Sequence, residues 1–540
     1  MLKKIFITLL LAIANLYPVF AQPNNRAAQS AGTQVLFNVR AYGAVGDGKN
    51  LDSPFINKAI DACAQAGGGT VLLPAGTYLS GSIRLKSNIN LLIDAGATIL
   101  GAPQEMNAYD SSEPFPNPPA FQDGGHTYFH NSLIWGENLV NVSITGQGLI
   151  NGGGLLTNDG PQDRIDGFSN FGRATPQPPS TVDISTVRVG NKAIALKLCR
   201  NVIMRDFTII HGGHFAILVT GCDGMTVDNV TMDTNRDGID IDACRNTVVS
   251  NCRINSPNDD GLCLKSSFAL GRNVICENIT ITNCQVFGFY EGTLLDGTMK
   301  QKPDGQGRIK FGTEANGGYR NITISNCVFR GCRGLALEEV DGGIMENITI
   351  DNISMMDVQS YAIYVTTGRR NRGPNITAKS TARNIMISNV VATGVDRRSG
   401  IILQGMDDQP IEGLRLENIR LVFNGGGTKE DAAIVAPELN KAYPEPRGTL
   451  PASGIFARHI KDLELANVRF SYDLNDMRPP MIFSDINGLE IDNLKTPVSA
   501  GVSAATFENV RGMVVRNSPV LDQVVSAENS KNGKSAKSKK

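Results

Sequence analysis

The sequence has very little of several features that mark common protein classes. Its 540 residues include one tryptophan and five histidines, and the net charge is −1. The balanced charge and the lack of a basic patch in the body argue against a nucleic-acid partner. No Cys-x-x-Cys pair or cysteine and histidine spacing of a zinc site occurs. After the first 22 residues, no apolar run approaches the roughly 18 residues that cross a bilayer. We expect no nucleic acid, no membrane span, no cofactor and no metal.

The two ends of the chain differ from its body. Residues 1–21 begin with a positively charged segment, continue as an apolar run and end on a small residue, which predicts a cleaved secretory signal peptide. No cysteine follows it to accept a lipid. Residues 22–36 predict a flexible leader, and residues 521–540, rich in Lys and Ser, predict a disordered tail. We therefore expect a protein exported to the periplasm or the extracellular space.

One segment near the N-terminus has the pattern of an amphipathic helix. Between Asp52 and Ala66, apolar residues recur at Ile56, Ile60 and Cys63, and the three glycines that begin at Gly67 end the pattern. Short β-rich runs separated by glycine turns follow. We interpret the helix as a cap on the end of a repeat fold, because terminal units of such folds cover an otherwise exposed core.

The body of the chain repeats a short frame, apolar-x-Asn-apolar-x-apolar. Apolar residues stand two before the asparagine and then one and three after it, so the pattern changes phase there, as two short strands meeting at a corner would require. The shortest full spacing, 22 residues, fits one coil of a parallel β-helix, and we expect residues 37–520 to form one such domain. The asparagines of the frame are Asn229, Asn251, Asn283, Asn326, Asn352, Asn389, Asn418, Asn467, Asn493 and, more weakly, Asn509.

Three longer segments interrupt this repeat. Gln104 to Asn131 and Gly152 to Thr186 are long, and the first is rich in proline and aromatic residues, so they could wall a groove or merely cover one side of the coils. Gly425 to Leu450 is a polar insertion late in the repeat.

The ten cysteines raise the question of disulfides in an exported chain. Cys252, Cys284 and Cys327 each follow the asparagine of the frame at an apolar position. Core packing as small buried side chains is favoured over bridging for these three.

Two acidic segments stand at the same place in successive coils. Asp237 follows Asn229 by eight residues, and Asp259 follows Asn251 by eight. Because adjacent strands lie roughly 4.8 Å apart, this register brings Asp237 beside Asp259 or Asp260. Mutual repulsion would raise at least one pKa, which gives the protonated acid and ionised base that inverting glycoside hydrolysis needs. A calcium site, or acidic turns facing solvent, would show the same spacing.

At these residues the chain resembles a known family. NRDGID (Asn235 to Asp240) and NDDGLCLKSS (Asn258 to Ser267) are similar to the NTDGID and GDDCIAIKSG signatures of glycoside hydrolase family 28, which holds polygalacturonases and rhamnogalacturonan hydrolases. The resemblance runs from about residue 37 to residue 496. It implies an all-β, right-handed parallel β-helix and hydrolysis with inversion.

The resemblance also implies roles for particular residues. Asp259 would be the general acid, and Asp237 and Asp260 would hold and activate the water. Lys265 occupies the position of the lysine after the second motif and would border the site.

Other parts of the family pattern are altered. The histidine expected one coil later is missing near Glu291, which the frame places in the column of Asp237 and Asp259, and the nearest Gly-x-Gly carries Gln306 in the middle. His214 could line the neighbouring coil, although a lone histidine is more often structural.

The basic Arg-Ile-Lys segment of the family is also displaced. Its expected position holds Ala336-Leu337-Glu338, followed by Glu339, whereas Arg308 and Lys310 carry the same letters one coil earlier. The acidic pair would suit hydrogen bonds to neutral sugar hydroxyls better than contact with a carboxylate. Arg308 and Lys310 could bind a uronate from another side or be surface charges on a strand.

We therefore expect a monomeric, exported, pectin-active glycoside hydrolase that cleaves galacturonosyl or rhamnogalacturonan-type linkages, from a chain end, without a metal. Two other functions stay open. A polysaccharide lyase on the same fold would use Arg308, Lys310 or Lys265 as the base, and a non-catalytic β-helix would only bind carbohydrate.

Overall fold

The computed structural model describes most of the chain from Leu36 onwards. Leu36–Lys540 forms one compact unit. The described residues are 36–113, 126, 128–157, 188–398, 400–438, 448–524 and 526. The predicted signal peptide, all of the predicted leader except Leu36, and residues 527–540 of the predicted tail lie outside them. Leu521, placed in that tail, is buried and ends a short 3-10 helix.

Parallel strands form three stacks, and successive coils of the chain supply strands to the stacks in turn. The first stack contains β1 (Leu36–Asn38), β3 (Gly69–Leu73), β6 (Ile89–Ile93), β9 (Val140–Thr145), β12 (Arg200–Arg205), β15 (Asp223–Asp228), β18 (Arg245–Ser250) and β21 (Cys276–Thr282). The second contains β2 (Asp47–Leu51), β4 (Gly76–Ser80), β7 (Ala97–Gly101), β10 (Leu149–Asn151), β13 (Thr208–Ile210), β16 (Thr231–Asp233), β19 (Arg253–Asn255) and β22 (Gln285–Phe287).

The third stack carries the residues of the candidate site. It contains β5 (Ile83–Arg84), β8 (Ile134–Glu137), β11 (Lys192–Lys197), β14 (Phe215–Thr220), β17 (Asp237–Asp242), β20 (Leu262–Ser266), β23 (Ile309–Ala315), β25 (Leu335–Glu339), β27 (Ile363–Thr367) and β29 (Ile401–Gln404). In the later coils, long strands cross from one stack to the next without a break: β24 (Tyr319–Arg330), β26 (Ile344–Met356), β28 (Thr381–Val395), β30 (Ile411–Gly425), β31 (Ile455–Leu474), β32 (Met481–Asp492) and β33 (Ala505–Arg516).

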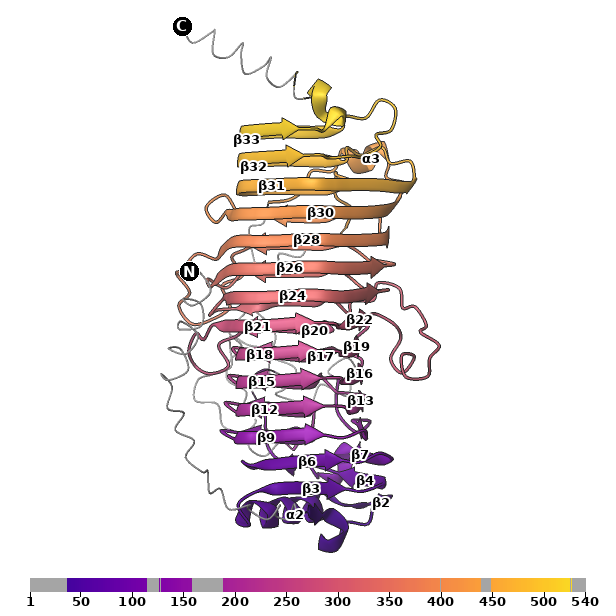
Figure 1. Cartoon of the computed structure of the whole chain (residues 1–540), viewed down its shortest axis with the longest axis vertical. Coiled ribbons are helices and arrows are strands. Elements are labelled where there is room, and N and C mark those ends of the chain that lie inside the picture. Colours follow the sequence, from indigo (N-terminus) through magenta and orange to yellow (C-terminus); the bar gives the residue numbers. More distant parts are fainter. Residues whose placement is uncertain are drawn as a thin grey trace, which may run out of the picture. The chain divides into compact units, whose positions relative to one another are not determined.

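The result is a right-handed parallel β-helix, as the repeat and the resemblance predicted. Figure 1 shows the coils piled from β3 at one end to β33 at the other, with the helix α2 (Ser53–Gln65) across the first coil. Ile56, Ile60 and Cys63 of that helix are buried against the core, so the predicted capping helix is confirmed. Short helices also occur at η1 (Val39–Tyr42), η2 (Gln104–Met106), α3 (Lys429–Ala432) and η6 (Pro519–Leu521). Among the helices of the described residues, none combines the length and the apolarity of a membrane-crossing segment.

The corners of the coils are built by asparagines in the left-handed backbone conformation. Every asparagine of the predicted frame has φ between 50° and 57°, a conformation that asparagine tolerates better than most residues. Their amides form a ladder along the stack: Asn418 donates to Asn389 at 2.9 Å, and Asn467 donates to Asn418 at 3.0 Å. A second ladder, in which Asn384 donates to Asn347, runs along another corner. Sequence analysis did not identify this second column.

The space between the stacks is one continuous apolar core of inward-facing aliphatic side chains. All ten cysteines lie in the described part of the chain, and all are buried and unbridged. The prediction that Cys252, Cys284 and Cys327 pack in the core is confirmed.

Candidate active site

Three aspartates gather at the start of adjacent strands in the third stack. Asp237 is the first residue of β17, and Asp259 and Asp260 lie in the turn before β20. Ile239 pairs with Leu262, so Asp237 and Asp260, each two residues earlier, are neighbours on successive coils. Carboxylate oxygens of the three aspartates lie within 4.8 Å of one another. The register argument therefore predicted their proximity correctly.

One member of the cluster reaches solvent and two do not. Asp237 is 3% exposed and Asp260 is 1% exposed. The side chain of Asp259 is 25% exposed, and its Oδ2 atom lies 2.6 Å from Nη2 of Arg236. A ligand that approaches the cluster thus meets Asp259 and Arg236 first.

The surroundings of the two buried aspartates shift their pKa values in opposite directions. Burial, together with the charges of Asp259 and Asp240, raises the pKa of Asp237 well above its usual range. Burial alone would also raise the pKa of Asp260, but Arg308, Lys310 and Lys265 outweigh it and lower that pKa. Asp237 therefore keeps its proton to a higher pH than Asp260 does.

The cations that ionise Asp260 come from β23 and the residue before it. Arg308 donates from Nε to Oδ1 of Asp260 at 2.5 Å, and Nζ of Lys310 lies 3.3 Å from Oδ2 of Asp260. The other end of the Arg308 guanidinium donates to the hydroxyl of Tyr361. Both cations are nearly fully buried, so they are part of the site and the alternative of surface charges is wrong.

Three carboxylates at this spacing could also bind a metal ion. Oxygen ligands of this kind suit a hard cation such as Ca²⁺. Here Arg236, Arg308 and Lys310 already compensate the negative charge of Asp259 and Asp260. The donor set therefore fits a cation poorly, and the chemistry proposed below involves none.

A second layer of buried charge lies beside the cluster. Nζ of Lys265 lies 3.1 Å from Asp240 and 3.4 Å from Glu314, and His126 contacts Asp240 at 3.0 Å. Asp240 and Glu314 raise the pKa of Lys265 well above its usual range, although burial opposes them. Lys265 therefore borders the site as predicted and is held protonated. Arg370 also belongs to this layer, because it pairs with Glu314.

The two predicted glutamates of β25 point to opposite sides of the strand. Leu335 and Leu337 belong to the inner core, whereas Ala336 packs in a separate cluster on the outer face. Because side chains alternate along a strand, Glu338 lies on the outer face, and its Oε1 atom is 3.9 Å from Nζ of Lys310.

Glu339 lies on the inner side of the same strand. It is fully buried, and its carboxylate accepts a hydrogen bond from the backbone N–H of Gly343 at 2.9 Å. Burial, with the nearby charge of Asp341, raises the pKa of Glu339. The structure thus separates the predicted acidic pair, and only Glu338 joins the site.

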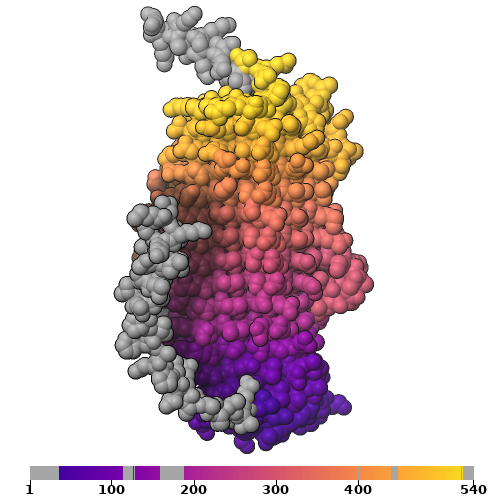
Figure 2. Space-filling view, in the orientation of Figure 1, coloured from indigo at the N-terminus to yellow at the C-terminus, as the bar shows by residue number. Residues whose placement is uncertain are grey.

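The predicted column position of Glu291 is wrong. After β22 the chain leaves the coil in an excursion of residues 288–308, which Figure 1 shows projecting beside β22 and Figure 2 shows as a pink bulge. Ile309 pairs with Leu262, so Gly307, two residues earlier, takes the register position next to Asp260. Glu291 instead lies 3.5 Å from His211.

His214 belongs to the coil that precedes the site. It is buried and packs edge-on against Phe215, with ring centroids 4.4 Å apart. Phe215 pairs in register with Asp237. His214 thus packs against the residue that pairs in register with Asp237.

Several site residues had no clear signal in the sequence. Arg236 and Asp240 lie inside the first acidic motif, which could have pointed to them. His126, Glu314 and Tyr361 reach the site from distant parts of the chain, and no spacing rule connects them to it.

The outer face of the third stack is covered on both sides of the charged cluster. Toward the N-terminus, Phe129 packs with Phe215 and Leu218. Toward the C-terminus, Tyr364 and Ile402 pack with further apolar residues. That second cluster comprises Ala336, Tyr361, Tyr364, Ile402, Ala436, Leu450, Ala452 and Phe456, of which Ala436 and Leu450 come from the late insertion.

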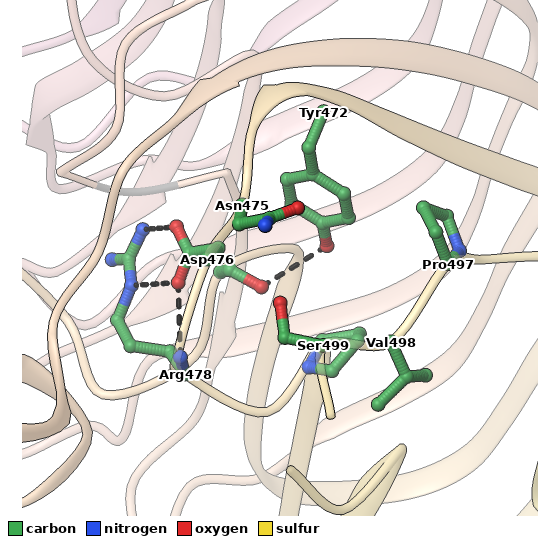
Figure 3. Close-up of a pocket in the computed structure, with 9 residues that line it drawn as sticks. Tyr472, Asn475, Asp476, Arg478, Pro497, Val498 and Ser499 are labelled. Carbon is green, nitrogen blue, oxygen red and sulfur yellow. Dashed lines mark hydrogen bonds and ion pairs between the residues drawn. The ribbon is translucent and has the colours of Figure 1, made fainter. Parts of the chain in front are cut away.

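A buried ion pair fixes the insertion to the coils. Figure 3 shows Arg478 paired with Asp476 beside a pocket that Tyr472 also lines. Arg478 donates to the backbone oxygen of Leu450 at 3.0 Å and to that of Arg397 at 2.6 Å. This pocket lies by β31 and β32, away from the coils of the aspartates, and we assign it a structural role.

Comparison with known proteins agrees with this architecture. Residues 36–263 match the family described as Rhamnogalacturonase A/epimerase, pectate lyase-like. A probable polygalacturonase of Vitis vinifera is 23% identical over 431 residues, which cover 76% of this chain and 80% of the relative. An exopolygalacturonase of Platanus acerifolia is 23% identical over 74% of this chain and 93% of the relative. The structure of an exopolygalacturonase from Thermotoga maritima matches with a TM-score of 0.58 and 18% identity, over 81% of this chain and 92% of that chain.

The polygalacturonase relatives and the matched family model identify the chain as a glycoside hydrolase on a pectate-lyase-like β-helix. Within that class, the matched family model and the polygalacturonase relatives support a divergent member of glycoside hydrolase family 28.

Proposed function

We propose that this protein is an exported, pectin-degrading glycoside hydrolase that cleaves galacturonosyl or rhamnogalacturonan-type linkages with inversion. The observation that carries the proposal is the cluster of Asp237, Asp259 and Asp260, whose carboxylate oxygens lie within 4.8 Å of one another. Within it, the surroundings raise the pKa of Asp237 and lower the pKa of Asp260. Inverting hydrolysis needs one carboxyl to protonate the leaving oxygen and another to activate water. The polygalacturonases among the relatives support a pectic substrate.

The roles follow from exposure and register. Asp259 is the cluster's partly exposed member, so it meets the glycosidic oxygen and donates the proton, as its motif position also implies. Asp260 and Asp237, adjacent on successive coils, hold the water, and ionised Asp260 accepts its proton. The proton that rests on Asp237 in the free protein reaches Asp259 within the cluster, whose oxygens lie within 4.8 Å of one another.

We propose that the protein attacks the end of a chain, and the covered outer face supports this. Phe129 covers the coils before the cluster, and the late insertion covers Tyr364, Ile402 and Phe456 after it. A polysaccharide threaded along the stack would collide with both coverings. A terminal sugar that enters at Asp259 would not.

A lyase mechanism is disfavoured by the charges around its candidate bases. A lyase needs a basic side chain that can accept the proton next to the uronate carboxyl. Lys265 is held protonated by Asp240 and Glu314, and Arg308 and Lys310 are committed to Asp260. None of these three cations is placed to act as a base at neutral pH.

Replacement of the proton donor tests the proposal. Asp259→Asn should lower kcat for release of reducing sugar from pectic oligosaccharides by about 10²- to 10⁴-fold, the usual contribution of a general acid. Oligosaccharide binding, measured by calorimetry, should remain detectable. Asp407→Asn, at an exposed turn, is the matched control and should keep full activity. Unchanged turnover in Asp259→Asn would remove Asp259 from the donor role.

A further inference from the structure

The ion pair of Arg236 and Asp259 stands at the entrance of the candidate site. Arg236 directly precedes Asp237 in the turn that enters β17. Its Nη2 atom lies 2.6 Å from Oδ2 of Asp259, and the two side chains are 21% and 25% exposed. The motif of the resembling family has a small polar residue at this position. The guanidinium of Arg236 therefore distinguishes this chain from that motif.

The other cations that pair with carboxylates at the cluster are buried deeper and committed. The side chain of Arg308 is 1% exposed, that of Lys310 is 6% exposed and that of Lys265 is 8% exposed. Each pairs with at least one buried carboxylate of the site. To bind a sugar acid directly, any of them would have to leave a buried partner without its charge, which is strongly unfavourable. Arg236 has a partner that is itself partly in water.

The same pair also obstructs the chemistry. While Asp259 accepts a hydrogen bond from Arg236 at 2.6 Å, its Oδ2 atom is turned toward the guanidinium. It cannot deliver a proton to a glycosidic oxygen from that state. The free protein therefore shows a resting arrangement that the substrate must open.

We propose that Arg236 recognises a uronate carboxylate of the substrate and exchanges Asp259 for it. This inference rests on the hydrolytic function proposed above. The planar fork of a guanidinium matches a carboxylate in a two-point contact, which makes arginine well suited to the task. The exchange keeps Arg236 paired with a carboxylate. It frees Asp259 to take up the proton of Asp237 within the cluster and to turn toward the glycosidic oxygen. Cleavage is thereby coupled to an acidic sugar next to the scissile linkage.

The coupling predicts a preference within pectic substrates. The wild-type protein should act better on oligosaccharides with a free uronate than on the same oligosaccharides with that carboxyl methyl-esterified. An ester lacks the charge that competes with Asp259 for Arg236. The preference should appear in kcat as well as in KM, because a bound ester leaves Asp259 paired with Arg236.

The experiment compares both substrates in Arg236→Ala, Arg236→Lys and the wild type. Arg236→Ala should lose about 10- to 100-fold in kcat/KM on the acid, as expected for loss of a charged hydrogen bond, and should act on the ester at least as well as the wild type, because Asp259 is then no longer held by the guanidinium. Arg236→Lys should recover part of the loss, since it keeps the charge but not the fork. Arg320→Ala is the matched control, because Arg320 pairs with Glu277 on the outside of β24 at 2.6 Å and lies far from the aspartates in the fold.

Equal loss on the acid and the ester would overturn the inference, since Arg236 would then only support the turn. Higher activity of Arg236→Ala on both substrates would also overturn it, because the pair would then only inhibit. A binding measurement that does not depend on turnover distinguishes failure of this inference from failure of the hydrolytic proposal. In the Asp237→Asn background, calorimetry with galacturonate should show weaker binding when Arg236 is replaced by Ala, whether or not the wild type hydrolyses any substrate. Equal galacturonate affinity with and without Arg236 contradicts the inference.

Discussion

At the scale of single residues, the site is a set of buried charges that stabilise one another. Ionised side chains are rarely buried unless they are paired. Here Asp260 is held by Arg308 and Lys310, and Glu314 is held by Lys265 and Arg370. Each carboxylate keeps its charge because it has more than one cationic neighbour, and each cation is oriented for the same reason.

Glu314 offers a direct test of this network. Burial opposes its ionisation, but Lys265, Arg370, His126 and Arg372 together lower its pKa well below the usual range. A lowered pKa in the folded state contributes stability above the unfolded value of about 4.3, and that contribution is lost as the pH falls toward the folded value.

Glu314→Gln should therefore destabilise the fold at pH 7 by about 3 to 5 kcal/mol, the usual cost of removing one partner of a buried pair. The difference from the wild type should shrink as the pH is lowered below about 4. Denaturant unfolding at several pH values measures both. Glu412→Gln, which removes an exposed pair with Lys461, should change stability by less than about 1 kcal/mol. Similar losses of stability in the two variants would show that the buried network contributes no more to the free energy of unfolding than an exposed ion pair does.

Sequence reasoning located this site but not all of its members. Asp237, Asp259 and Asp260 were found because they stand close in the chain and share the coil register. Arg308 and Lys310 were found as a literal match, but their pairing with Asp260 depends on the length of the excursion before β23. Glu291 was misplaced for that same reason. His126 and Glu314 arrive from other coils, and only the folded chain shows them.

At the scale of elements, the corner asparagines determine where the chain bends from one stack to the next. The frame predicted these corners because the phase change in apolar positions can be seen along the chain. It did not predict that β24, β26 and later strands would continue through the corner, because an asparagine with φ near 55° can bend a strand without ending its pairing.

Two substitutions at Asn418 separate the contributions of its left-handed backbone and of its side-chain hydrogen bonds to stability. Its φ is 56°, and its amide links Asn389 and Asn467. Asn418→Ala should cost about 2 to 4 kcal/mol, from a left-handed residue with a Cβ and two lost hydrogen bonds.

Asn418→Gly is the matched variant, since glycine accepts the left-handed backbone without strain. It should lose only the hydrogen bonds, about 1 to 3 kcal/mol, and so be more stable than Asn418→Ala. Thermal and denaturant unfolding give the comparison. A glycine variant less stable than the alanine variant would contradict the conformational explanation.

At the scale of the whole unit, the coils bring distant residues to one outer face. Asp237, Asp260 and Lys310 belong to three successive coils, and their spacing is set by strand pairing. Phe129 and the late insertion then cover the face on either side. The fold supplies the register, and the irregular segments restrict access to it.

The covered face predicts the pattern of products. If the proposed attack at a chain end is right, a long pectic polymer should release small products from the start, and the viscosity of the solution should fall slowly relative to the release of reducing ends. Size analysis of early products, together with viscometry, gives this result. A rapid fall in viscosity with large early fragments would show that the chain is cut internally.

The stereochemistry of the first product tests the central claim, hydrolysis by a carboxylate pair with water between them. We predict that proton NMR of fresh digests of an α-linked pectic oligosaccharide shows the β-anomer of the new reducing sugar first, with the α-anomer appearing later by mutarotation. No unsaturated sugar should form. First appearance of the α-anomer, or of an unsaturated uronide, would contradict the account.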